Sequence, residues 1–226
     1  MLFTTFIAGV LFAMPSFVLQ AIATPAEVGD ATAFASSTDQ GYGIKWTGVI
    51  VPGEAETELW GYVDEIYASI LAINPDYVAQ PINYTSDAGG SESNNLEKRD
   101  VSCATMATGD KTELGVKQNN YLRTVGGFCA SPKDRCRRTA CGGTSATYIC
   151  GENGNSISVP CVEVAQKLSL IVNGCCAAKG RKGVSGTWTT YAWKVWAGYG
   201  NCNHASETWP SNYPYPGGSP NGICYN

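Results

Sequence analysis

Histidine is almost absent from this chain of 226 residues, in which His204 is the only one. A single imidazole excludes a metal site with two histidine ligands and a ribonuclease mechanism that needs two histidines. After residue 99 the chain also lacks the motifs G-x-S-x-G, H-E-x-x-H, G-x-G-x-x-G and the phosphate-binding P-loop. The remaining enzyme hypothesis is a small secreted ribonuclease or other hydrolase that uses His204 with Glu207, Arg137 and Arg138, and its alternative is that His204 is a solvated loop residue.

Cysteine is absent from the first 99 residues, whereas all ten cysteines lie at Cys103 or beyond. The charge changes sign at the same place. Residues 1–99 hold 3 basic and 12 acidic residues, a net charge of −9, and residues 100–226 hold 12 basic and 7 acidic residues, a net charge of +5. Because cysteine content and net charge change at the same place, the sequence predicts two distinct parts and not one domain.

Long apolar runs are also scarce, and the one at residues 2–19 is followed by the triplet Ala21-Ile22-Ala23. This pattern predicts a secretory signal peptide over residues 1–23, with a membrane anchor as the alternative. A secreted chain meets oxidising conditions, so we expect an extracellular protein with up to five disulfides and no metal site or cofactor. The bridging cysteines would be Cys103, Cys129, Cys136, Cys141, Cys150, Cys161, Cys175, Cys176, Cys202 and Cys224.

A Gly- and Ser-rich stretch ends at Lys98-Arg99, directly before the cysteine-rich part. Kexin-type proteases of the secretory pathway cut after such pairs. We therefore predict an acidic propeptide, residues 24–99, that is discarded and shields the basic mature part, residues 100–226, until export. The alternatives are an uncut linker and a second cut at Arg181-Lys182. The sequon at Asn83 would leave with the propeptide.

The pattern of the chain predicts an α+β fold. In the propeptide, two short strands and a helix with apolar residues at 63–73 form a small ββα unit. In the mature part we expect helices over 112–124 and 158–174, the second with Ser158 as N-cap. Between them lie a basic loop over 128–143 and a strand over 144–151, and a long aromatic strand follows over 186–200.

Two surfaces are candidates for binding. The basic loop carries Lys133, Arg135, Arg137 and Arg138, which predict a patch that faces an anion such as a channel vestibule, an acidic lipid headgroup or nucleic acid. An ordinary solvated loop is the alternative. The second surface is the aromatic strand, whose large rings could stack on the sugars of a wall polysaccharide or could simply pack in a core. These rings are Trp188, Tyr191, Trp193, Trp196 and Tyr199.

Two segments carry a resemblance to a known family. Residues 148–158, YICGENGNSIS, and residues 167–175, KLSLIVNGC, resemble the killer toxin of smut fungi and its relatives among small cysteine-rich secreted fungal proteins. The resemblance implies an antiparallel sheet with two helices on one face, and a toxin or effector that perturbs calcium channels of competing cells. It also places Tyr148 where that toxin has a functionally important lysine.

The resulting prediction is a secreted, killer-toxin-like or effector protein that works by binding and not by catalysis. Its partners would be the processing protease and a target on competing or host cells, which could be an ion channel, an anionic lipid or a wall polysaccharide. We expect a monomer without a nucleic-acid partner. A wall-polysaccharide-binding module is the second hypothesis, and the small hydrolase is the third.

Overall fold

A computed structural model describes residues 42–80, 101–103, 105–175 and 183–203. Several predicted features lie outside these residues: the signal peptide, the sequon at Asn83, the dibasic pairs Lys98-Arg99 and Arg181-Lys182, and His204 with Glu207. Below, residues 42–80 are called the N-terminal segment, and the described residues between 101 and 203 are called the body.

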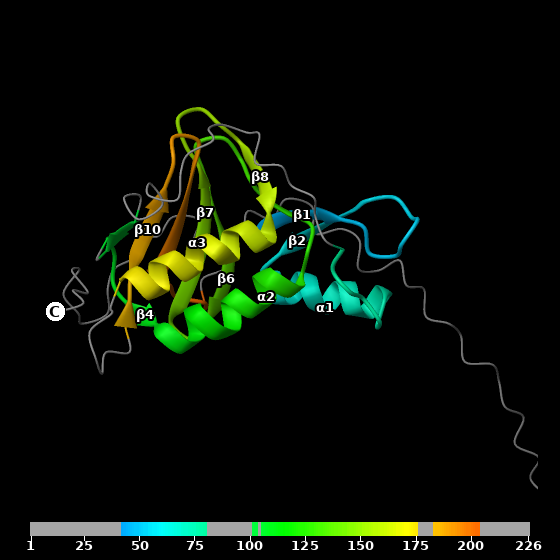
Figure 1. Cartoon of the computed structure of the whole chain (residues 1–226), viewed down its shortest axis with the longest axis horizontal. Helices are drawn as coiled ribbons and strands as arrows, with labels where there is room; N and C mark the ends of the chain where they lie inside the picture. Colours follow the sequence, from blue (N-terminus) through cyan, green and yellow to red (C-terminus); the bar gives the residue numbers. More distant parts are fainter. Residues whose placement is uncertain (1–41, 81–100, 104, 176–182, 204–226) are drawn as a thin grey trace, which may run out of the picture. The chain divides into compact units, whose positions relative to one another are not determined.

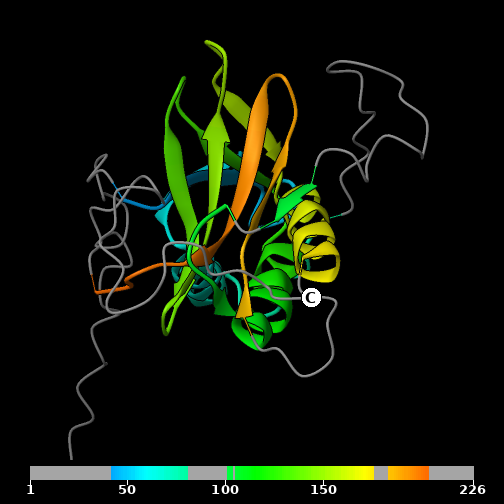
Figure 2. The same cartoon turned by 90° about the vertical axis from the view of Figure 1, so that its left-hand side faces the viewer.

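The body is built on a five-stranded antiparallel sheet, which stands upright in Figure 2. Successive residues of β11 point to opposite faces of this sheet, and α3 packs against one of the two faces. In spatial order its strands are β3 (Val101–Cys103), β10 (Gly186–Thr189), β11 (Trp193–Tyr199), β7 (Ser145–Gly151) and β6 (Cys136–Gly142).

A second antiparallel sheet has four strands and combines both parts of the chain. Two strands of the N-terminal segment lie beside two strands of the body, and a separate two-stranded sheet joins β4 (Gly109–Asp110) to β9 (Gly183–Val184). In spatial order the four strands are β2 (Thr57–Gly61), β1 (Ile44–Gly48), β5 (Phe128–Ser131) and β8 (Ile157–Pro160).

Helices cover the inner face of the five-stranded sheet (Figure 1). The π-helical turn η3 (Glu113–Gln118) continues directly into α2 (Asn119–Thr124) and packs on β6 and β7. Helix α3 (Cys161–Gly174) packs on β10 and β11, and α1 (Val63–Ile73) contacts α2. The protein is therefore α+β with antiparallel sheets, as the sequence predicts.

Helix α3 has the regular spacing of apolar residues that allowed it to be predicted from the sequence. Its apolar residues recur every three or four positions, and Val164, Leu168 and Ile171 are completely buried. The helix starts later than predicted, because Pro160 and not Ser158 precedes it. Ser158 instead lies in β8, where it pairs with Ala130.

Two further expectations about local structure are wrong. The basic segment is not an irregular loop, since β5 and β6 occupy most of it and only residues 132–135 form a turn between them. The long aromatic strand is a hairpin of β10 and β11 that turns at residues 190–192. Thr190 closes this turn, because its backbone N–H and its hydroxyl both donate to the carbonyl of Trp193 at 2.8 and 3.0 Å.

Four disulfides staple the body, and eight of the ten cysteines belong to them. Cys176 and Cys224 lie outside the described residues. The disulfide pairs are Cys103–Cys175, Cys129–Cys161, Cys136–Cys150 and Cys141–Cys202.

Among the residues that the structure places, no helix has the length and apolar character needed to cross a bilayer.

Glu163 in the first turn of α3 makes a pH-dependent contribution to stability. Burial raises the pKa of its carboxyl above the ordinary value of 4.5, although Lys167 one turn later lowers it. A carboxyl with a raised pKa binds its proton more tightly in the folded state, so stability falls as pH rises through the window above 4.5.

We predict that Glu163→Gln removes this component of the pH dependence, because the neutral amide has no proton to lose. Thermal denaturation at a series of pH values should show a Tm that declines less steeply above pH 4.5 in the variant than in the parent protein. Glu54→Gln, at an exposed turn, is the control and should keep the parent slope. An equal decline in the Glu163 variant would contradict the assignment.

Candidate functional site

Three turns meet at one end of the five-stranded sheet, at the top of Figures 1 and 2. They are residues 132–135 between β5 and β6, residues 152–156 between β7 and β8, and residues 190–192 between β10 and β11. We call these three turns the turn cluster. All three connect strands whose other ends are anchored in the core, which makes the cluster an ordered surface.

Hydrogen bonds join the three turns to one another. The backbone N–H of Gly154 donates to the Asp134 carboxylate at 2.6 Å, which ties the first turn to the second. The Asn153 amide donates to the carbonyl of Tyr191 at 2.7 Å, and the Glu152 N–H donates to the carbonyl of Ala192 at 2.9 Å, which tie the second turn to the third. The cluster is therefore one bonded unit.

The backbone of the turn cluster also explains its residue types. Asn153 and Gly154 have φ angles of 51° and 80°, left-handed backbone angles that asparagine and glycine adopt more readily than other residues. Asp134 has a φ of 52°, a conformation that aspartate tolerates better than most residues. Directly beneath these turns, the Cys136–Cys150 disulfide links paired residues of β6 and β7.

The exposed side chains of the turn cluster include two cations and an aromatic ring. Lys133 and Arg135 are exposed, and Tyr191 is 78% exposed. Both carboxylates of the cluster have partners: Glu152 pairs with Lys194 at 3.0 Å, and Asp134 accepts from the neutral N–H of Gly154 and keeps its negative charge. Such a surface offers positive charge, hydrogen-bond donors and a flat ring, which suit recognition by contact.

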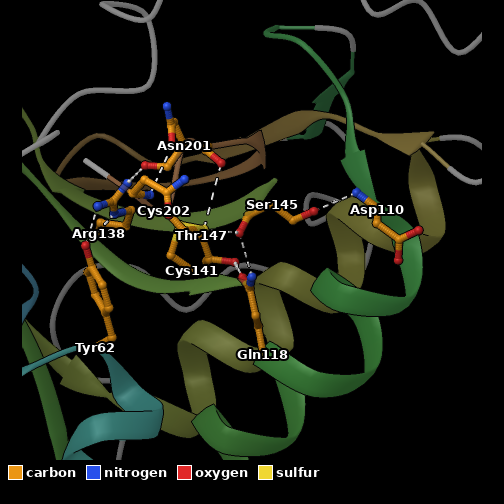
Figure 3. Close-up of a disulfide and its surroundings, with 11 residues drawn as sticks. Tyr62, Asp110, Gln118, Arg138, Cys141, Ser145, Thr147, Asn201 and Cys202 are labelled. Atoms are coloured by element: carbon orange, nitrogen blue, oxygen red, sulfur yellow. Dashed lines mark hydrogen bonds between the residues drawn. A yellow bond between two sulfur atoms is a disulfide. The ribbon is translucent and has the colours of Figure 1, made fainter. Parts of the chain in front are cut away.

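The structure divides the four predicted binding cations into two pairs. Lys133 and Arg135 lie at the surface, whereas Arg137 and Arg138 in β6 are only 5% and 1% exposed. Figure 3 shows that Arg138 points toward Tyr62 of the N-terminal segment. Its Nε donates to the Tyr62 hydroxyl at 3.0 Å, and its Nη1 donates to the carbonyl of Asn201 at 3.1 Å. Burial also makes Arg137-Arg138 an unsuitable dibasic cleavage site.

The predicted aromatic platform is not assembled on the surface. Trp188 and Trp193 are 4% and 7% exposed and pack edge to face with their ring centres 4.9 Å apart. The ammonium of Lys167 lies 4.5 Å from the ring centre of Trp188. Trp196 is half-buried, with Lys194 beside its ring. Trp188 and Trp193 therefore pack in the core, which was the alternative to a sugar-stacking role.

The sequence grouped Tyr191 with the aromatic strand and Asp134 with the basic loop, and it did not place either residue in a set of turns that meet. Tyr191 was hidden inside an aromatic run with no glycine, proline or asparagine to mark a turn. The Asn153-Gly154 pair predicted the second turn from the sequence. That the other two turns lie beside it follows only from the arrangement of the strands. Among the described residues no group of histidine, cysteine or acidic side chains is arranged to hold a metal ion.

Comparisons of the chain with protein-family models, with curated proteins and with solved structures find no match.

The Asp134 carboxylate is the part of the turn cluster most open to a direct test. We predict that Asp134→Ala speeds hydrogen exchange of the Gly154 amide and lowers stability by about 1 kcal/mol, because an exposed N–H then loses its charged acceptor. Hydrogen exchange measured by NMR is the readout. Asp134→Asn keeps an acceptor oxygen and should retain most of the protection. Unchanged exchange at Gly154 in the alanine variant would show that this bond does not hold the turns together.

Proposed function

We propose that this protein is a secreted, killer-toxin-like or effector protein that acts by binding a target on competing or host cells. The observation that carries the proposal is the turn cluster, which presents Lys133, Arg135 and Tyr191 on a bonded, disulfide-supported base. A rigid exposed surface loses little conformational entropy on binding, which favours affinity. The four disulfides support an extracellular setting.

The arrangement of the resembling segments supports the family hypothesis. Residues 148–158 span part of β7, the second turn of the cluster and the start of β8, and residues 167–175 span most of α3. Within residues 148–158, Asn153 and Gly154 of the second turn face solvent. Packing of α3 and of η3 with α2 on one face of the antiparallel sheet agrees with the fold that the resemblance implies.

The proposed target is an acidic surface, with the vestibule of an ion channel as the first candidate. Tyr148, at the position where the resembling toxin has a lysine, is completely buried and cannot supply a contact charge. Lys133 and Arg135 of the turn cluster would take over that role. Attraction between these cations and an acidic vestibule would be weakened by salt, because exposed charges are screened over about 8–10 Å at physiological ionic strength.

We predict that the double variant Lys133→Ser/Arg135→Ser raises the concentration needed for half-maximal growth inhibition of a sensitive fungal strain about tenfold or more. Loss of two exposed cations removes attraction to an acidic target, and 1.4 kcal/mol corresponds to about a factor of ten. The readout is a dose series of purified protein at low and at physiological salt, with circular dichroism to verify folding.

Lys117→Ser provides a matched control, since this side chain is 65% exposed and lies on η3, away from the three turns. It should leave the dose series unchanged. Equal inhibition by the parent and the double variant would refute a role for the turn cluster. Sedimentation of the protein with chitin or glucan, retained in the double variant but lost in Tyr191→Ala, would favour wall binding instead.

A further inference from the structure

The N-terminal segment lies inside the fold and is not wrapped around it. Strand β1 is an interior strand, because it pairs with β2 on one side and with β5 of the body on the other. Six apolar side chains of the segment belong to the same buried core as Leu114, Leu122 and Val164 of the body. These six are Ile44, Trp46, Ile50, Val63, Ile66 and Ile70.

Trp46 is the centre of this contact. Its indole is completely buried, and its Nε1–H donates to the carbonyl of Gly126 at 2.9 Å. Gly126 and Gly127 both have a φ near +60°, and a Cβ atom on Gly127 would lie 2.6 Å from the indole nitrogen of Trp46. The body therefore contains a slot that glycine keeps open and that the indole fills.

Other contacts surround the Trp46 slot. Arg138 of the body donates to the Tyr62 hydroxyl and lies 5.0 Å from the centre of its ring, and burial raises the pKa of that phenol so that it stays neutral. The Tyr77 hydroxyl donates to the carbonyl of Val125 at 2.8 Å. Tyr67 packs edge to face on Tyr121.

No covalent bridge can hold the segment to the body once the connection is cut, because residues 1–99 contain no cysteine. The Lys98-Arg99 pair lies between the two, outside the described residues. Cutting there would leave two chains joined by burial, the β1–β5 ladder and the Arg138–Tyr62 contact. Release of the segment would expose the edge of β5 and the apolar slot, which is unfavourable in water.

We propose that the N-terminal segment stays bound after cleavage as the second, non-covalent chain of the processed protein, with Trp46 as its anchor. The segment is then a subunit and not the discarded propeptide predicted from the sequence. This inference goes beyond the proposed function and does not depend on which target the turn cluster binds.

The test is to cut the purified full-length chain after Arg99 with a dibasic-specific protease, or within residues 81–99 at an inserted site for a specific protease. Size-exclusion chromatography without denaturant, with intact mass analysis of each peak, should find both chains in one peak. Concentrated guanidinium chloride without reductant should separate them. A body that elutes alone in native buffer would overturn the proposal.

Trp46→Ala identifies the anchor, because emptying the slot should weaken the association of the cut chains on the order of 100-fold or more and let them separate. Ile73→Ala, on the same segment but 53% exposed, is the matched control and should leave the chains together. If Trp46→Ala prevents folding before the cut, the result with the parent protein still decides the proposal. Growth inhibition by the same fractions tests the proposed function separately.

Discussion

The fit of one indole against two glycines organises much of this structure. Trp46 can lie against the start of β5 only because Gly127 carries no side chain, and Gly126 accepts the hydrogen bond of the indole through its carbonyl. Both glycines adopt left-handed backbone angles. With Trp46 in place, β1 completes a sheet with β5, and α1 brings Ile66 and Ile70 into the core that also contains Leu122. Two stretches of opposite net charge thus share one hydrophobic core, although composition alone separates them at Lys98-Arg99.

Covalent and non-covalent forces hold different parts of this core. Disulfides act only within the cysteine-rich part, and β6 is stapled at both ends by Cys136–Cys150 and Cys141–Cys202. Such bridges stabilise mainly by restricting the unfolded chain. Within the described residues, the N-terminal segment is held to the body by burial, by hydrogen bonds and by the contacts of Arg137 and Arg138 with the rings of Trp60 and Tyr62. Because a small domain buries a smaller fraction of its surface than a larger one, the segment supplies core that the body by itself would lack.

The sequence predicted those elements whose pattern is local. The helical spacing of Val164, Leu168 and Ile171 marks α3, and Asn153-Gly154 marks a turn because its backbone needs left-handed residues. It missed what depends on distant partners. Consecutive arginines suggest solvent, yet Arg138 is buried because Tyr62, 76 residues away, accepts its hydrogen bond. The turn at Tyr191 has no glycine or proline, so only pairing of β10 with β11 reveals it.

Four cations that are neighbours in the sequence occupy two different environments, because two of them lie in a turn and two lie in a strand. Lys133 and Arg135 belong to a turn that the Asp134 carboxylate ties to the backbone of Gly154 in the second turn. Arg137 and Arg138 belong to strand β6, where both side chains are buried, Arg137 beside the ring of Trp60 and Arg138 beside the ring of Tyr62. A guanidinium remains charged when buried, so it needs acceptors and aromatic faces there. In this protein the N-terminal segment provides both aromatic rings and the Tyr62 hydroxyl, and the carbonyl of Asn201 in the body provides a further acceptor. The contacts of the inner pair of cations therefore favour retention of the segment, whereas the outer pair is exposed.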